Sequence, residues 1–214
     1  MPSLLPAPSP LCHTGGFTAT NGYAFPTPEG WIGVDAPEGF AAWLTSKNLH
    51  LSALLLTHAH FDHVMDAAAV VRDHKCPVYA WEASSRETRL EVFLLEMGGI
   101  ELCVEEYSVD HPLKCPPEKN LQVCGVEINF ALVPGHSADS VIFCLPSFDW
   151  IFSGDTLMQG AIGRTDFPGG STEQLLEGIR KEILTKNNQT MLFPGHGEPT
   201  RVGMERAWIE CYRE

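Results

Sequence analysis

Four apolar runs of strand length, each ending at a histidine or an aspartate, constrain the fold of this chain more than any other feature of its sequence. The runs ALLLT, FALVP, WIFS and MLFP lead into His58, Gly135-His136, Gly154-Asp155 and Gly195-His196. Glycine permits the turns and close approaches that other residues avoid. We therefore expect a sheet-rich fold whose strand ends hold these side chains in one rigid site.

The first run ends in the densest group of histidines, the stretch THAHFDH at 57–63. His58 and His60 are two residues apart in an extended chain end, so they should point the same way. Asp62 and His63 continue the chain toward the next helical segment and should face a second position. This spacing predicts that the stretch supplies ligands to metal ions.

The donor set across all four strand ends suits two metal ions. It comprises five imidazoles and two carboxylates: His58, His60, His63, His136, His196, Asp62 and Asp155. Such a nitrogen-rich set favours zinc, iron, manganese or cobalt over magnesium or calcium. Seven donors exceed one tetrahedral site with an open position, but they fit two metals if one carboxylate bridges.

The other histidines and the cysteines are interpreted as structural. A single histidine near a core is more often a satisfied structural residue than a ligand, which is our interpretation of His13, His50, His74 and His111. The seven cysteines include no CxxC pair and are odd in number. They indicate reduced core residues rather than a disulfide framework or a thiolate zinc site.

Composition limits the possible partners and locations. The formal charge is −13 without a stripe of Lys and Arg, so nucleic acid is not an expected partner. Membrane association is not expected either, because no apolar run approaches the length that spans a bilayer. The Pro-rich start lacks the charged and apolar regions of a signal peptide, which favours a cytoplasmic protein.

Strand-like and helical patterns alternate along the chain, as in a layered α/β (α+β) domain with two sheets or one mixed sheet covered by helices. The strand-like segments are 17–25, 31–35, 51–57, 77–81, 122–133, 141–145, 150–155 and 190–193, and the helical segments are 38–47, 63–74, 84–97 and 171–184. Two helices begin with capping-box patterns, Ser84 with Glu87 and Ser171 with Gln174. We expect residues 1–15 to form a Pro-rich extension and 16–214 a single domain.

Four motifs resemble the metallo-β-lactamase superfamily: THAHFDH, PGHS at His136, SGD at Asp155 and PGHG at His196. WIGVDAPEG, with Asp35, is also similar to the family. The stretches SGDTLMQGAIGRTDFPGGSTEQLLEGIRKEI and FPGHGEPTRVGMER most resemble short glyoxalase II-like hydrolases. The resemblance implies an αββα sandwich with its site at one edge of the two sheets.

The resemblance also implies a ligand arrangement and a reaction. One metal would take His58, His60 and His136, the other Asp62, His63 and His196, with Asp155 as the bridge. The expected metals are two zinc ions, with iron or manganese possible. A bridging hydroxide would attack the carbonyl of a thioester or ester, and Asp62 would orient the hydroxide or handle its proton. The expected partner is therefore a small-molecule substrate.

Two further features of the sequence bear on which substrate the protein would bind. Arg164, in GRTDF, lies where relatives place a basic residue, so it is a candidate clamp for a substrate carboxylate. The alternative is a pair with Asp166 that stabilises the loop. Only 18 residues follow His196, so we expect no counterpart of the helical region with which glyoxalase II binds glutathione. Which thiol carries the acyl group of the substrate is therefore left undecided.

Rival activities belong to the same superfamily. A persulfide dioxygenase would hold one iron on His58, His136 and Asp155, but such enzymes tend toward PAHDY where this chain has PGHGEP. The Gly-rich GRTDFPGG loop favours the thioesterase-like branch over β-lactam hydrolysis, and the acidic charge argues against nuclease activity. A further hypothesis is that the domain binds metal but catalyses no reaction. The presence of all seven predicted ligands disfavours it.

Overall fold

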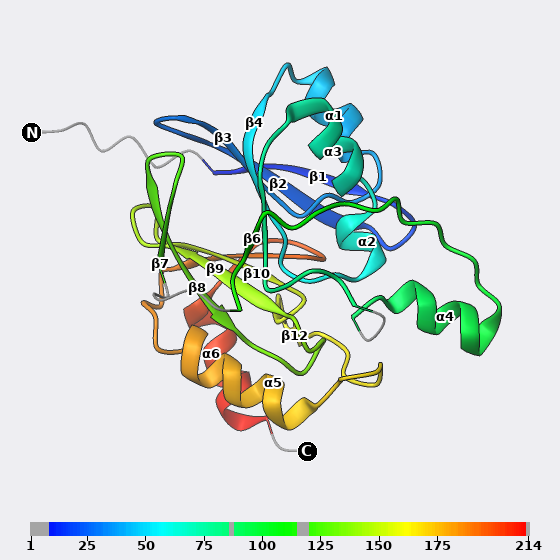
Figure 1. Cartoon of the computed structure of the whole chain (residues 1–214). Helices are drawn as coiled ribbons and strands as arrows, with labels where there is room; N and C mark the ends of the chain where they lie inside the picture. The colour runs from blue at the N-terminus through cyan, green and yellow to red at the C-terminus, as the bar shows by residue number, and fades with distance from the viewer. Residues whose placement is uncertain (1–8, 86–87, 115–119, 213–214) are drawn as a thin grey trace, which may run out of the picture.

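The computed structural model describes residues 9–85, 88–114 and 120–212, and it forms a four-layered sandwich. Within these residues, two six-stranded sheets pack face to face with helices on their outer faces (Figure 1). The covering helices are α1 (Phe40–Ser46) and α3 (Ala67–His74) on one side and α5 (Thr172–Gly178) and α6 (Val202–Cys211) on the other. The αββα architecture expected from the sequence is confirmed.

The first sheet brings the THAHFDH stretch to the site. Its strands are β1 (Leu11–Gly15), β2 (Thr20–Thr27), β3 (Gly30–Val34), β4 (Leu51–Leu55), β5 (Val78–Ala80) and β6 (His111–Pro112), in that order. The first three are antiparallel and β3 to β6 are parallel. Because β1 pairs with β2, the expected boundary at residue 15 falls at the end of a strand of this sheet.

The second sheet supplies the three Gly-His and Gly-Asp motifs. Its order is β14 (Thr200–Arg201), β13 (Met191–Pro194), β10 (Trp150–Gly154), β9 (Val141–Leu145), β8 (Val126–Leu132) and β7 (Asn120–Val123). Strands β10 and β13 are parallel, so Asp155 and His196 emerge at the same edge. A small ribbon, β11 (Leu157–Met158) with β12 (Ala161–Ile162), follows β10.

Three layers of apolar side chains hold the sandwich together. Between the sheets, the fully buried rings of Phe25 and Phe152 stack with centroids 5.5 Å apart. Beneath the helices the packing is mostly aliphatic, with Leu44, Leu54 and Val70 on one side and Ile151, Leu175 and Ile179 on the other. Burial of these surfaces is the main driving force that keeps the strand ends in place.

Some element boundaries differ from the sequence-based expectation. Helix α4 spans Leu90–Gly98 rather than 84–97, and Glu87 of the expected capping box lies outside the described residues. The segment 122–133 is a hairpin, because Cys124 and Gly125 both take positive φ and turn the chain. The helix at 171–184 is capped by Ser171 as expected but continues from α5 into a π-helical turn at Ile179–Ile183.

Helix α6 was not predicted from the sequence, although it packs against the second sheet. None of the helices in the described part of the chain is both long enough and apolar enough to cross a bilayer.

Candidate metal centre

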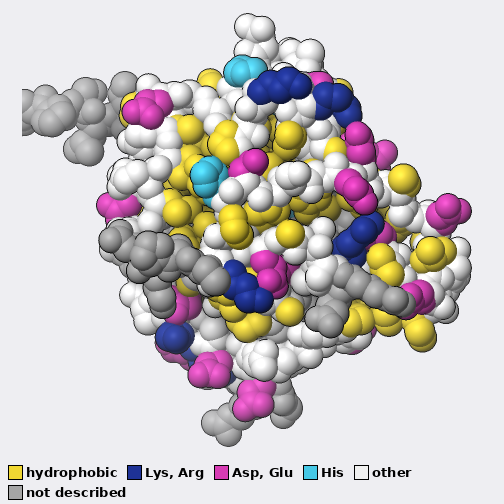
Figure 2. All heavy atoms as spheres, viewed as in Figure 1, with side chains coloured by type: hydrophobic (Ala, Val, Ile, Leu, Met, Phe, Trp, Pro, Cys, Tyr) yellow, Lys and Arg dark blue, Asp and Glu magenta, His cyan; other side chains and the backbone are white. Residues whose placement is uncertain are grey.

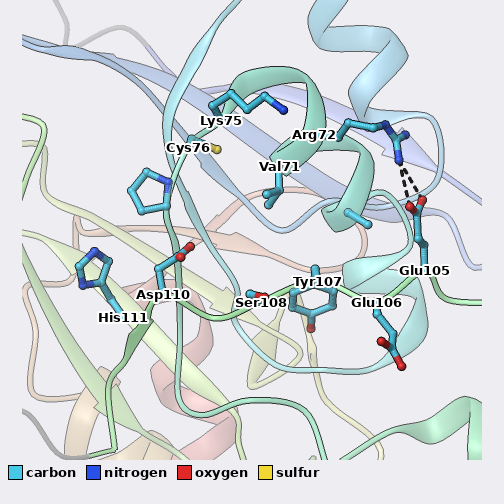
Figure 3. A pocket seen from close by; sticks show the side chains of 12 residues that line it. Val71, Arg72, Lys75, Cys76, Glu105, Glu106, Tyr107, Ser108, Asp110 and His111 are labelled. Atoms are coloured by element: carbon cyan, nitrogen blue, oxygen red, sulfur yellow. Dashed lines mark hydrogen bonds and ion pairs between the residues drawn. The ribbon is translucent and has the colours of Figure 1, made fainter.

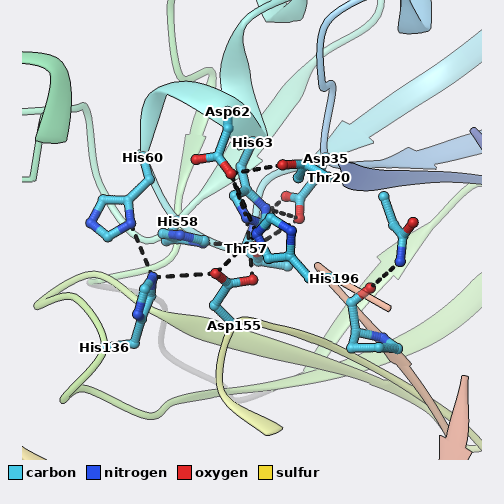
Figure 4. A network of polar contacts seen from close by, with 12 residues as sticks. Thr20, Asp35, Thr57, His58, His60, Asp62, His63, His136, Asp155 and His196 are labelled. Atoms are coloured by element: carbon cyan, nitrogen blue, oxygen red, sulfur yellow. Dashed lines mark hydrogen bonds and ion pairs between the residues drawn. The ribbon is translucent and has the colours of Figure 1, made fainter. Parts of the chain in front are cut away.

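The seven side chains predicted as ligands lie together where the two sheets meet at one edge (Figure 4). Strand β4 ends at Leu55, and His60 is the N-cap of the short helix α2 (Phe61–Val64). This change from strand to helix directs His58 and His60 to one position and Asp62 and His63 to another. The later motifs supply the remaining side chains from the second sheet.

The first group consists of three buried imidazoles, those of His58, His60 and His136. One ring nitrogen of each lies within 4.8 Å of the others. His60 Nδ1 and His136 Nε2 are 3.0 Å apart. Two of these side chains follow strands of the first sheet and one follows a strand of the second, and they are the three that the resemblance implies for one metal.

The second group consists of Asp62, His63 and His196, whose ligand atoms also lie within 4.8 Å of one another. Asp62 Oδ2 is 3.8 Å from His63 Nε2 and 3.4 Å from His196 Nε2. Thr20 Oγ1 donates to the same carboxylate oxygen at 2.7 Å and orients it. This is the set of residues expected at the second metal position.

Asp155 lies between the two groups. Its Oδ2 is 3.6 Å from His136 Nε2 in the first group and 3.3 Å from His196 Nε2 in the second. Its Oδ1 is 3.3 Å from His63 Nε2. A carboxylate in this position can join two cations, as a bridge requires.

A chain of hydrogen bonds fixes the orientation of His58 and His63. His63 Nδ1 donates to Asp35 Oδ2 at 2.8 Å, and Thr57 donates to both Asp35 oxygens, from its backbone N–H and its Oγ1. Since the Thr57 hydroxyl proton is used on Asp35, Thr57 Oγ1 accepts from His58 Nδ1 at 3.1 Å. Both imidazoles therefore turn Nε2 toward the centre.

Backbone carbonyls orient two more histidines in the same way. His136 Nδ1 donates to the carbonyl of Arg164 at 2.8 Å, and His196 Nδ1 donates to the carbonyl of Thr18 at 3.1 Å. A carbonyl only accepts, so Nδ1 must carry the proton and Nε2 is left as the inward-facing ligand atom. These supporting partners were not identified from the sequence, since neither carbonyl belongs to a motif.

The polar atoms at the centre fit metal ions. His58 Nε2, His63 Nε2 and Asp155 Oδ1 are buried yet make no hydrogen bond among the described residues. Buried polar atoms normally have a partner, and these three converge on the centre. Imidazole nitrogen and carboxylate oxygen are ligands for zinc, iron and manganese alike, so the cluster suits metal ions without selecting one.

The two groups differ in charge. Burial lowers the pKa of His60 to about 3 and also lowers the pKa of His58 and of His136, so the first group is neutral. In the second group, burial would lower the pKa of His196, but hydrogen bonds to Asp155 and Asp62 raise it to about 10. Cations must therefore displace protons from the second group when they bind.

Close packing explains the glycine of the PGHG motif. A Cβ on Gly195 would collide with Asp155 Oδ1 and with His63 Cε1. The preceding strand thus runs directly against the bridge residue and one ligand. Any side chain at this position would move the ligands apart.

A cavity of about 330 Å³ opens onto the cluster. Its lining comprises His60, Asp62, His136, Asp155 and His196 together with Thr18, Phe61, Leu90, Leu94, Arg164 and Phe167. Arg164 donates from Nε and Nη2 to the two oxygens of Asp166, each at 2.7 Å, and its guanidinium lies 3.8 Å from the centre of the Phe167 ring. Of the two roles considered for Arg164, the loop pair is thus formed.

A larger groove of about 950 Å³ lies elsewhere, between α3 and the segment 105–111 (Figure 3). None of the seven clustered side chains lines it, and its Arg72 is paired with Glu105 at 3.0 Å. We therefore assign the chemistry to the smaller cavity beside the cluster.

Comparison with known families agrees with this geometry. The family model described as "Metallo-beta-lactamase superfamily" matches residues 31–196, which is more than half of the chain. The chain belongs to the metallo-β-lactamase superfamily. Relatives of the chain within this superfamily include proteins described as hydrolases. This similarity supports the assignment of the chain as a metal-dependent hydrolase.

Two relatives and one solved structure illustrate the similarity. A probable metallo-hydrolase of Bacillus subtilis is 36% identical over 167 residues, covering 77% of each chain. The hydroxyacylglutathione hydrolase GloC of Haemophilus influenzae is 33% identical over 162 residues, covering 74% of each. The crystal structure of the B3 metallo-β-lactamase BLEG-1 superposes with a TM-score of 0.80 at 30% identity, covering 92% of this chain and 96% of that one.

Proposed function

We propose that this superfamily member is a metal-dependent thioesterase that hydrolyses S-acylglutathione-type thioesters or related esters at a centre of two divalent cations. The observation that carries the proposal is the position of Asp155 between two His-rich groups, each with its ligand atoms within 4.8 Å. The similarity to a hydroxyacylglutathione hydrolase supports a thioester as the substrate.

The residues divide the work as follows. His58, His60 and His136 would hold one cation, Asp62, His63 and His196 the other, and Asp155 would bridge them. The cations, most simply zinc, would lower the pKa of a water molecule and polarise the substrate carbonyl. Asp62 borders the cavity and is held through Oδ2 by Thr20, so its other oxygen can accept a proton from the attacking water. The C–S bond then breaks to give a carboxylate and a thiol.

The persulfide dioxygenase predicted as an alternative uses fewer of these residues. One iron on His58, His136 and Asp155 would leave Asp62, His63 and His196 without a role in metal binding. Yet these three form a complete group of their own, with Asp62 oriented by Thr20. The geometry therefore favours the hydrolase.

The experiment that tests the proposal has two parts. The first is the metal content per chain of protein purified without added metal, repeated after loading with zinc; we expect two ions. The second is hydrolysis of S-lactoylglutathione, with nitrocefin and glutathione persulfide as comparison substrates. One iron per chain with oxygen uptake on the persulfide would replace the hydrolase with the dioxygenase, and nitrocefin hydrolysis alone would indicate a β-lactamase.

A further inference from the structure

The cavity beside the metal centre is lined by both polar and apolar side chains. The polar lining includes the clustered His and Asp side chains. Phe61, Leu90, Leu94 and Phe167 also line it, and we call these four residues the apolar wall. A substrate carbonyl placed at the cluster would therefore have hydrocarbon beside it.

Helix α4 supplies two of the four residues of this wall. Leu90 and Leu94 are four residues apart and so lie on the same face of the helix. Phe93 of α4 contacts Phe167, with ring centroids 6.1 Å apart, and Phe167 stands edge-on to His60 at 6.3 Å. The apolar wall therefore begins next to a residue of the first metal group.

Helix α4 also stands out from the body of the molecule (Figure 1), and hydrophobic side chains gather over it (Figure 2). Some of them point to solvent: Leu95 is 50% exposed and does not line the cavity. Leu94, its neighbour, does line the cavity. The two residues provide a matched pair for testing the wall.

The charge at the rim of the cavity is already balanced. Arg164 borders the cavity, but both oxygens of Asp166 accept from it and its guanidinium covers a face of Phe167. A charged or strongly polar group placed against the apolar wall would lose its hydration without gaining a partner. The wall therefore selects for an apolar group.

We propose that the enzyme is specific for thioesters with an apolar acyl chain, and that Leu90, Leu94 and Phe167 determine this preference. The inference rests on the proposed thioesterase function. A glutathione moiety carries carboxylates, an ammonium and amides, so it cannot be buried against hydrocarbon without a large cost. The thiol part must then extend past the rim, which leaves the cavity of about 330 Å³ for the acyl chain.

The first test measures kcat/KM of the zinc-loaded protein for acetyl, butyryl, hexanoyl, octanoyl and decanoyl thioesters of glutathione, beside the lactoyl thioester. Each methylene buried against the wall should raise kcat/KM about fourfold until the cavity is filled. Butyryl should exceed lactoyl, which carries a hydroxyl. Equal rates for all chain lengths, or a preference for lactoyl, would overturn the inference and leave the thioesterase standing.

Variants of the wall sharpen the test. Leu94→Phe should move the preferred chain to a shorter one, and Leu94→Ala should move it to a longer one. Leu95→Ala is the control and should keep the wild-type profile. An unchanged profile in both Leu94 variants would show that the chain binds elsewhere.

Binding provides a readout that does not depend on turnover. S-alkylglutathiones are thioethers and cannot be hydrolysed, so calorimetry with the methyl, butyl and hexyl compounds reports the cavity alone. Affinity should rise with alkyl length in the wild type and lose that dependence in Leu94→Phe. If the zinc-loaded protein hydrolyses none of the thioesters, the proposed function itself fails, and that result differs from every outcome that removes only the chain preference.

Discussion

Asp35 Oδ2 lies 2.8 Å from His63 Nδ1, so the residue that follows strand β3 holds an imidazole of the second group from behind. Both groups are almost wholly buried, and Thr57 holds the carboxylate with two hydrogen bonds. Through Thr57 the same carboxylate also sets the orientation of His58. One carboxylate outside both groups thus orients one imidazole in each of them.

Replacing Asp35 should therefore weaken metal binding. Asp35→Asn keeps the size and tolerates the positive φ at this position, but it removes the charge that orients and polarises His63. We expect zinc affinity to fall about 10- to 100-fold, measured by competition with a chelator. Asp166→Asn, at an exposed position, should leave affinity unchanged; equal affinity in both variants would contradict the role of Asp35.

The collision predicted at Gly195 can be tested within its own motif. Gly195→Ala should abolish tight binding of at least one metal, because the added Cβ would displace Asp155 or His63. Gly197→Ala is the control, since its Cβ would meet no neighbour within 4 Å although φ is +74°. That variant should lose about 1–2 kcal/mol of stability and retain its metals. Metal analysis after gel filtration distinguishes the two.

Zinc should stabilise the protein and release protons as it binds. At a free concentration of about 100 times Kd, zinc should add about 2.7 kcal/mol, which raises Tm by about 5–11 °C for a chain of this size. Because hydrogen bonds to Asp155 and Asp62 raise the pKa of His196 to about 10, its proton must leave near pH 7. Calorimetry in buffers of different ionisation enthalpy measures the release, and a buffer-independent heat would contradict it.

His74 should make the fold sensitive to mild acid, away from the metal centre. Burial and the neighbouring His50 lower the pKa of His74 below 6.5, and its Nδ1 accepts from the Leu51 N–H at 3.3 Å. The unfolded chain then binds the proton more readily, so stability contributed by neutral His74 is present above pH 6.5 and is lost as pH falls. The Tm of the wild type minus the Tm of His74→Gln should therefore become smaller as the pH is lowered from 7.5 to 5.5. A difference that does not change with pH would refute this prediction.

The candidate role of Arg164 as a clamp for a substrate carboxylate can be tested separately from the apolar wall. If it also contacts a carboxylate of glutathione at the rim, Arg164→Ala should raise KM for S-acylglutathiones and leave KM unchanged for thioesters of a thiol without a carboxylate. The pair with Asp166 is exposed, so Tm should change little. An unchanged KM for both substrates would reduce Arg164 to a loop-stabilising residue.

The clustering of His58, His136, Asp155 and His196 could be expected from sequence because each follows an apolar strand, and strand ends meet at a sheet edge. The supporting contacts could not. Every residue has a backbone carbonyl, so the sequence does not mark those of Thr18 and Arg164. Only the fold brings them within reach of the two histidines.

The predicted boundaries of helices and strands were wrong where tertiary packing overrode the local sequence pattern. The alternation through 122–133 reads as one strand, but a turn at Gly125 divides it. Helix α6 buries only Val202, Glu205 and Ile209, and the packing of Val202 and Ile209 on the second sheet stabilises it. The apolar wall was missed because Leu90 and Leu94 look like ordinary core positions of a helix.

Each of the two groups takes two side chains from the amino-terminal sheet and its third from the carboxy-terminal sheet, and His60 and His136 are 76 positions apart. Neither half of the chain alone can then assemble a complete set of ligands. Metal capture becomes a late event in folding, one that reports the closure of the two halves on each other. A cation bound there would link the two halves of the chain. Removing it with a chelator should therefore weaken the packing between the two sheets before it unfolds either sheet.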